Sequence, residues 1–369
     1  MYATTVNLLE DSNFLAGIPL ISASPNAHSG DITFDVGRIF VRGDSEIRNE
    51  TLGIGNAGDI KITTGDLDFA EGSVIIGTSF GRGDAGDVSI NATGNVSFDL
   101  DFGGIHTNIG LQRNDTVIAN AVGNAGNIDI NAKSLSLTNG ARLVSKTSGQ
   151  GNAGNINVNV TETVFVDGEG ATPVTNNDNT YIFQSGIITE ATRQGKGNAG
   201  DIQINAQEFR LDNKGLVSAF GSTIGTRRDA GDIIINASEK VFLGIDTLLL
   251  TQIQKYSEGK GGDIKITTKT LNLVDSSILS DSKGVGDAGS IIIYASENIL
   301  LEDGTSKVLS QVSKGGQGNA GDIKLTTSRL SLDNFSQISS NTQGGAKGDA
   351  GSIIIKTDTL EVTRGSTID

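Results

Sequence analysis

Acidic side chains recur at one position of a repeated phrase, and oxygen ligands are what a calcium ion requires. The phrase Gly-Asn-Ala-Gly-Asp-Ile occurs at 55–60, 197–202 and 318–323, and altered copies occur elsewhere. The residue after its second glycine is aspartate in seven copies: Asp31, Asp59, Asp87, Asp201, Asp232, Asp263 and Asp322. In four other copies it is Asn127, Asn155, Ser290 or Ser352. These types share a short side-chain acceptor and not a charge, so the pattern favours a hydrogen bond to turn backbone, with a structural calcium site as the alternative.

A second polar row follows each copy of the phrase, on what the alternation predicts to be the outer face of a strand. Its members are Thr63, Asn91, Asn131, Asn159, Asn205, Asn236, Thr267 and Thr326. Regular threonine rows can bind ice or glycans. Here asparagine is at least as frequent as threonine, and Tyr294 and Lys356 interrupt the row. An ordinary solvated strand face with side-chain ladders is the favoured interpretation.

Paired carboxylates could serve a polysaccharide hydrolase or lyase. The acids to test for such an enzyme are Asp99, Asp101 and Asp115, which lie where the repeat lengthens to 40 residues. A second lengthening, to 46 residues, carries Asp167, Glu169 and Asp178. We expect the first extra loop near 109–122, after a third strand, and the second near 167–184, before one. The loops would then leave different corners of a coil, which argues against a joint site.

No other residue pattern assigns a catalytic, cofactor-binding or metal-binding site, and no cofactor is implied. His28 and His106 are the only histidines and have no metal-pair spacing, and cysteine is absent. Phosphate-loop, zinc-protease and nucleophile-elbow motifs are not found. The sequence therefore predicts a protein that is not an enzyme.

Charge and hydropathy exclude several partners. The net charge of -15 opposes binding to nucleic acid, where lysine and arginine must neutralise phosphates, and to an anionic membrane surface. No apolar run approaches the roughly 20 residues of a membrane-spanning helix. The first 17 residues lack a positive region and an apolar core, so they do not resemble a signal peptide.

Spacing of the phrase defines the elements that position these residues. Its second glycine, here called the marker glycine, recurs at steps of roughly 30 residues at Gly30, Gly58, Gly86, Gly126, Gly154, Gly200, Gly231, Gly262, Gly289, Gly321 and Gly351. After it comes a strictly alternating segment such as Ile60-Lys61-Ile62, then a short one such as Leu67 to Phe69, then a third such as Ala141 to Ser145. Three short strands per repeat predict an all-β, right-handed parallel β-helix (β-solenoid) of about eleven coils. A stack of antiparallel sandwiches is the rejected alternative, because the strand order is the same in each repeat.

The array is expected to span 30–369, with a partial preceding coil or N-terminal edge at 1–29. The alanine or threonine that closes the first strand, as in Ala206, Ala237 and Thr268, is expected at a tight corner. Residues 18–24 resemble a third strand without its preceding two, and the chain stops at Asp369 inside another. No polar cap is evident at either end, which favours a fragment of a longer solenoid.

The run Gly-Asn-Ala-Gly-Asp-Ile-x-Ile-Asn/Thr, then Leu-x-Leu, then Ser-x-Ile-x-Ser, resembles the repeat region of filamentous-haemagglutinin-type exoproteins, most of all the large cyanobacterial forms. The likeness covers about 30–369. It implies a right-handed β-helix, two-partner secretion through an outer-membrane partner, and an extracellular or cell-surface location. It carries over no catalytic residue. The expected function is a non-enzymatic structural or adhesive stalk with glycan or surface contacts; a carbohydrate-active β-helix enzyme is the alternative.

Overall fold

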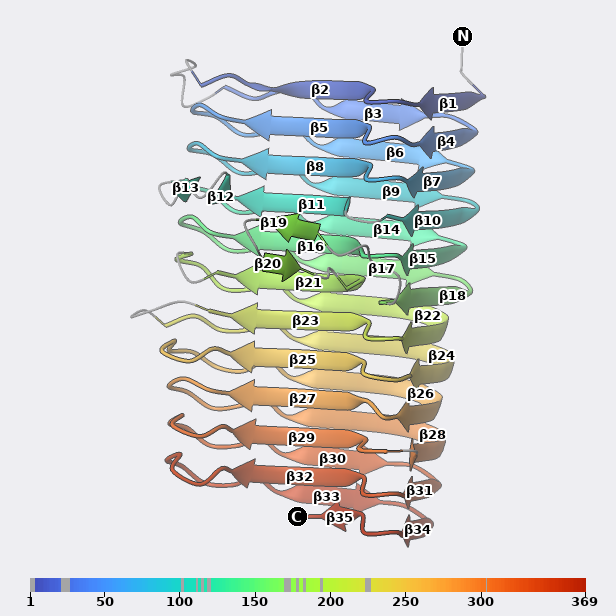
Figure 1. The fold of residues 1–369 in the computed structure, drawn as a ribbon, viewed down its shortest axis with the longest axis vertical. Helices are drawn as coiled ribbons and strands as arrows, with labels where there is room; N and C mark the ends of the chain where they lie inside the picture. The colour runs from blue at the N-terminus through green and yellow to red at the C-terminus, as the bar shows by residue number, and fades with distance from the viewer. Residues whose placement is uncertain are drawn as a thin grey trace.

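The computed structural model describes residues 4–20, 27–100, 103–110, 112–113, 116–117, 121–168, 174–176, 179–181, 184–192, 195–222, 227–302 and 304–369. These residues form strands and turns and contain no helix. Strands of successive repeats pair in parallel and stack as the coils of one elongated rod (Figure 1). Chain direction across the front and back of the rod in this view makes the β-helix right-handed. The predicted parallel β-helix is confirmed.

First strands follow the marker glycines, and we number the coils by them. They are β3 (Ile32–Asp35), β6 (Ile60–Thr64), β9 (Val88–Ala92), β14 (Ile128–Ala132), β17 (Ile156–Val160), β30 (Ile323–Thr326) and β33 (Ile353–Lys356). Second strands are β1 (Thr5–Leu8), β4 (Arg38–Val41), β7 (Asp66–Ala70), β10 (Asn95–Asp99), β15 (Ser134–Thr138), β18 (Thr163–Asp167), β31 (Arg329–Leu332) and β34 (Thr359–Val362). In coils 6 to 9 the two are continuous, as β22 (Ile202–Asp212), β24 (Ile233–Leu243), β26 (Ile264–Val274) and β28 (Ile291–Glu302).

Third strands form a separate twelve-stranded sheet. Its members are β2 (Asn13–Ile18), β5 (Glu46–Thr51), β8 (Val74–Ser79), β11 (Gly103–Ile109), β16 (Ala141–Thr147), β21 (Gly186–Ala191), β23 (Leu216–Gly221), β25 (Leu248–Ile253), β27 (Ser277–Ser282), β29 (Lys307–Val312), β32 (Gln337–Thr342) and β35 (Thr367–Ile368). Two small antiparallel pairs lie outside the coils: β12 (Gln112–Arg113) with β13 (Thr116–Val117), and β19 (Val174–Asn176) with β20 (Asn179–Tyr181).

Like residues stack on like residues in the core. Ile60 and Ile62 of β6 are fully buried and pair with Val88 and Ile90 of the next coil. Second strands repeat the arrangement, so that the ring of Phe69 lies 5.2 Å from that of Phe98. This alternation of buried and exposed residues is the predicted one, because a strand turns successive side chains to opposite faces.

Hydroxyl groups line one inner edge of the rod, which the sequence analysis did not predict. Buried Ser280 of β27 donates its hydroxyl to the carbonyl of the marker Gly262 and accepts the N–H of the marker Gly289. Ser145 makes the same pair of bonds with Gly126 and Gly154. Ser310 and Ser340 repeat the pattern, so each of these four serines ties its coil to the next from inside. The sequence did contain an indication of these bonds: in the third strand, a serine such as Ser280 stands two residues after a buried apolar residue and so points to the same inner face.

The preceding coil at the N-terminus differs from its prediction. We placed a third strand at 18–24, without its two predecessors. The third strand is instead Asn13–Ile18, paired with β5, and a second strand, Thr5–Leu8, pairs with β4. The prediction was wrong because the apolar residues around Pro19 are not the ones that pair: Val6 and Leu8 alternate with polar residues and pack against the core, and the third strand ends at Ile18. Residues 21–26 lie outside the described part.

The marker turns of adjacent coils lie too close together for a residue with a β-carbon. A β-carbon on Gly231 would lie 1.9 Å from the carbonyl oxygen of Gly200, and one on Gly262 equally close to that of Gly231. No side chain fits at that distance, so only glycine lets the turns of adjacent coils stack. This constraint explains why the marker is the most regular feature of the sequence.

Candidate binding groove

The acidic row of the sequence analysis is a ladder of hydrogen bonds between coils. The N–H of Asp263 donates to Asp232 Oδ1 at 2.8 Å, and the N–H of Asp232 donates to Asp201 Oδ1 at the same distance. Where the residue is asparagine the bond persists: the N–H of Asn155 donates to Asn127 Oδ1 at 2.8 Å. The predicted side-chain bond to turn backbone is confirmed, with the detail that the backbone belongs to the next coil.

A parallel ladder lies three residues earlier, at the Asn of Gly-Asn-Ala-Gly, and the sequence analysis missed it. The N–H of Asn198 donates to Asn152 Oδ1 at 2.9 Å, and the N–H of Asp229 donates to Asn198 Oδ1 at 3.1 Å. The signal was present, since Asn or Asp fills this position in most copies of the phrase. Two side-chain ladders therefore run along the marker turn.

Neighbouring carboxylates within the first ladder are partly neutralised by lysine. Lys61 Nζ lies 2.8 Å from Asp31 Oδ2 and 3.0 Å from Asp59 Oδ2. Coils 6 to 8 have three successive aspartates, and Lys265 Nζ lies 3.4 Å from the last of them, Asp263. Burial raises the pKa of Asp232, and the charges of Asp263 and Asp201 add to the effect. In the described part of the chain no group of three acidic or histidine side chains is placed to hold a metal ion.

The predicted outer row of asparagines is an amide ladder. Asn236 Nδ2 donates to Asn205 Oδ1 at 2.9 Å, and Asn205 Nδ2 donates to Asn159 Oδ1 at 2.7 Å. The ladder continues through Asn131 to Asn91. In coil 8 the row changes to Thr267, which has no amide, so the ladder ends at Asn236. This region of the outer face lies beside the corner between the first and second strands.

That corner, here called the first corner, alternates in length from coil to coil. In coil 6 two residues lie between Asn205 and Glu208, whereas in coil 7 three lie between the paired positions Asn236 and Lys240. Coil 8 has two again and coil 9 three. The same alternation runs from coil 2 to coil 10. Each long corner therefore has one residue more than the short corners on either side of it.

A hollow of about 490 Å³ lies along this corner over coils 5 to 9. Its size falls in the range of ligand pockets, although it is an open groove and not an enclosed cavity. Three rows line it. The floor consists of Val160, Ala206, Ala237 and Thr268. The amide side consists of Asn205, Asn236 and Thr267. The corner side consists of Thr161, Ser238, Lys269 and Ser296.

Three of the four floor residues, Ala206, Ala237 and Thr268, were predicted to close the first strand at a tight corner, and the corner is where the structure places them. Ala237 and Thr268 are buried, and the register shifts directly after Ala206 and Thr268. Thr268 donates its hydroxyl to the carbonyl of Thr270 at 3.2 Å and so closes the turn. The small side chains of Ala206, Ala237 and Thr268 suit the sharp turn of the chain at this corner.

Charges on the groove's rim are paired. Lys269 Nζ lies 2.7 Å from Glu239 Oε2 on the adjacent long corner. This hydrogen bond is the main cause of a raised pKa of Lys269, and Glu297 adds to it from the other side. Long corners of coils 5, 7 and 9 carry the dipeptides Thr161-Glu162, Ser238-Glu239 and Ser296-Glu297. The groove therefore presents amides and hydroxyls and no unpaired cation.

Of the six acids considered for an enzyme, only Asp99 and Asp167 lie in the described part, where the register puts them in one row two coils apart; Glu169 and Asp178 lie outside it. Asp99 ends β10, where its Oδ1 accepts the hydroxyl of Thr138 at 3.1 Å and the amide of Asn139. Asp101 and Asp115 lie outside the described residues. The first extra loop follows β11, and the second lies between β18 and β21. Asp167 at the start of the second loop accepts a hydrogen bond from Asn213 at 3.1 Å.

His106 lies on β11 and His28 at a bridge beside Asn56, so they belong to different coils. Burial and the nearby Arg142 lower the pKa of His106 to about 4. Protonation is thus opposed near neutral pH, and no acidic partner faces the ring among the causes of the shift. The arrangement is that of a packed neutral imidazole.

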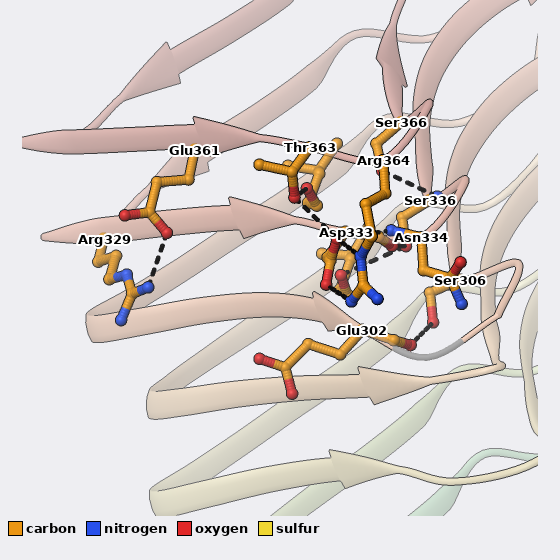
Figure 2. A network of polar contacts seen from close by, with 12 residues as sticks. Glu302, Ser306, Arg329, Asp333, Asn334, Ser336, Glu361, Thr363, Arg364 and Ser366 are labelled. Carbon is orange, nitrogen blue, oxygen red and sulfur yellow. Dashed lines mark hydrogen bonds and ion pairs between the residues drawn. The ribbon is translucent and has the colours of Figure 1, made fainter.

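Ion pairs join the last two coils. Figure 2 shows Arg364 reaching Asp333 from the turn above, together with Thr363, whose hydroxyl donates to Asp333 Oδ1 at 2.7 Å. These bonds hold the pKa of Asp333 well below its usual range, with Arg364 the largest cause. Arg329 pairs with Glu361 at 2.7 Å on the neighbouring strand face. The network connects coil 10 to coil 11.

Searches of protein-family models, curated proteins and solved structures found no match to this chain. No stretch of helix in the described residues is suited to cross a membrane.

Proposed function

We propose that this chain is a rod segment of a secreted or cell-surface exoprotein, with a structural and adhesive role and no catalytic one. The observation that carries the proposal is that the acidic side chains next to the marker glycines form hydrogen bonds between coils. Its side chains face along the rod and accept backbone N–H groups of the next coil, as Asp232 does from Asp263. Carboxylates engaged in this way hold coils together and do not converge on a substrate.

Rod geometry supports the proposal. Twelve stacked third strands span about 50 Å at a strand spacing of about 4.8 Å. Such a rod holds other regions away from a surface and presents the same outer row in many coils. Many weak contacts along that row give avidity without a single strong pocket. Filamentous-haemagglutinin-type proteins, which the repeat phrase resembles, export such rods through an outer-membrane partner.

Localisation on intact cells tests this role. Antibodies raised against the purified chain should label intact cells of the source, and external protease should remove the label. Disrupting the outer-membrane partner that the family resemblance implies should abolish it. Signal that appears only after lysis would contradict the proposal. The enzyme alternative is tested separately, by the release of reducing ends or unsaturated products from polysaccharides incubated with the chain.

A further inference from the structure

The groove along the first corner has a period of its own. Long corners in coils 5, 7 and 9 alternate with short corners in coils 6 and 8, so equivalent positions recur every two coils. Two coils measure about 9.6 Å along the rod. This length is comparable with one disaccharide unit of an extended glycan. A linear polymer lying along the axis would meet the same alternation of long and short corners at each unit.

Its lining offers hydrogen-bonding groups that the fold has left unused. Asn236 Oδ1 accepts no bond from the described residues, because the amide ladder ends there. The hydroxyls of Thr267, Ser238 and Ser296 make no hydrogen bond within the described chain, and all three residues are exposed. Amides and hydroxyls that both donate and accept match the hydroxyl groups of sugars.

The groove also has an apolar component. Half-buried Ala206 adds a small apolar surface to the groove, whereas Ala237 and Thr268 are buried beneath it. Tyr294 pairs in register with Thr267 and is 50% exposed, so it stands in the outer row one coil beyond the amide side. An exposed aromatic ring at the end of a polar groove supplies a stacking surface for a sugar ring.

Charge selects among glycans. Lys269 is the one lysine of the lining and is bound by Glu239, with Glu297 also near it. The chain carries a net charge of -15. An anionic polysaccharide would be repelled and would find no free cation, whereas an uncharged one meets neither obstacle.

We propose that the first-corner groove binds a linear, uncharged polysaccharide, laid along the rod with one disaccharide unit to every two coils. The site is defined by the groove itself, and it relies on the proposed surface role only for access to such polymers. Asn236, Ser238 and Thr267 hydrogen-bond the sugar hydroxyls. Tyr294 stacks on a ring at the groove's end.

Calorimetric titration of the whole chain with neutral hexasaccharides tests the proposal, using cellohexaose, chitohexaose and maltohexaose, with hexagalacturonate as the anionic probe. We expect at least one neutral hexasaccharide to bind with a dissociation constant of about 1 mM or below. Binding by hexagalacturonate alone would overturn the ligand class. Absence of binding by all the neutral probes would overturn the site and leave the localisation result of the rod unaffected.

Two variants within the groove and one control outside it test where the polysaccharide binds. Ser238→Trp fills the groove from an exposed long corner, and affinity should fall by at least about tenfold. Thr93→Trp makes the same change on the long corner of coil 3, outside the groove, and affinity should remain. Tyr294→Ala should weaken binding about threefold to tenfold through loss of stacking. Circular dichroism establishes that each variant is folded. Equal affinity in Ser238→Trp and the unaltered chain would contradict the assignment.

Discussion

The marker turn and the first corner are both places where every coil changes direction, yet they are built in opposite ways. At the marker turn, glycine backbones stack too closely for a β-carbon, and two side-chain ladders bond adjacent coils. At the first corner the number of residues alternates from coil to coil, and a groove remains. One corner holds the rod together, and the other is free to vary. Ligand contact is therefore expected at the first corner, where the stacking of coils constrains the residues least.

The largest effect should come from crowding the marker turn. In Gly231→Ala the new methyl group would lie 1.9 Å from the carbonyl oxygen of Gly200, and backbone must move to relieve it. We expect a loss of about 3 kcal/mol in the free energy of unfolding, measured by guanidinium denaturation. Gly344→Ala is the control, because nothing lies within 4 Å of its β-carbon position. Equal stability of the two variants would remove the spatial argument.

A smaller loss of stability is expected from breaking the ladder of aspartate side chains along the marker turn. Asp232→Ala leaves the N–H of Asp263 without its acceptor, which should cost about 1–3 kcal/mol in the free energy of unfolding. Asp232→Asn keeps an acceptor oxygen and should restore most of that stability. If asparagine were as damaging as alanine, the charge and not the hydrogen bond would be the stabilising element.

The pH dependence of stability, compared between the unaltered chain and Asp232→Asn, gives a further test of the ladder. Burial raises the pKa of Asp232 in the fold above its ordinary 3.8, so the folded protein holds that proton more firmly than the unfolded chain. Stability from this group is present at low pH and is lost as pH rises through the raised folded pKa. Asp232→Asn lacks that loss. Its stability relative to the unaltered chain should therefore increase from acid to neutral pH in thermal melts.

The smallest effect should come from the rim of the first corner. Lys269→Gln removes the ion pair with Glu239, but both side chains are about half exposed. Solvent-exposed pairs contribute little. We expect the melting temperature to stay within experimental error. A clear decrease would mean that charges, and not the strand register, set the shape of this corner.

Period-two alternation and the repeated glycine phrase were enough to predict the fold, because each expresses a local constraint that recurs in every coil. Ile60, Ile62, Leu67 and Phe69 all point inward as predicted. The groove could not be predicted in the same way. It depends on comparing the residue count at one corner between neighbouring coils, as between Asn205–Glu208 and Asn236–Lys240. The second ladder through Asn198 was visible in the phrase, but its bond joins two coils and needs their stacking to be known.

The most direct test of the difference between the marker turn and the first corner is a pair of single-residue deletions, compared by thermal unfolding. Deleting Ser238 converts the long corner of coil 7 into the short form that coils 6 and 8 already have, so the rod should keep its circular dichroism and nearly its melting temperature. Deleting Asn198 shortens the marker turn and removes a ladder residue bonded to both neighbouring coils, so melting should fall sharply. Equal tolerance of both deletions, or greater damage at Ser238, would contradict the account.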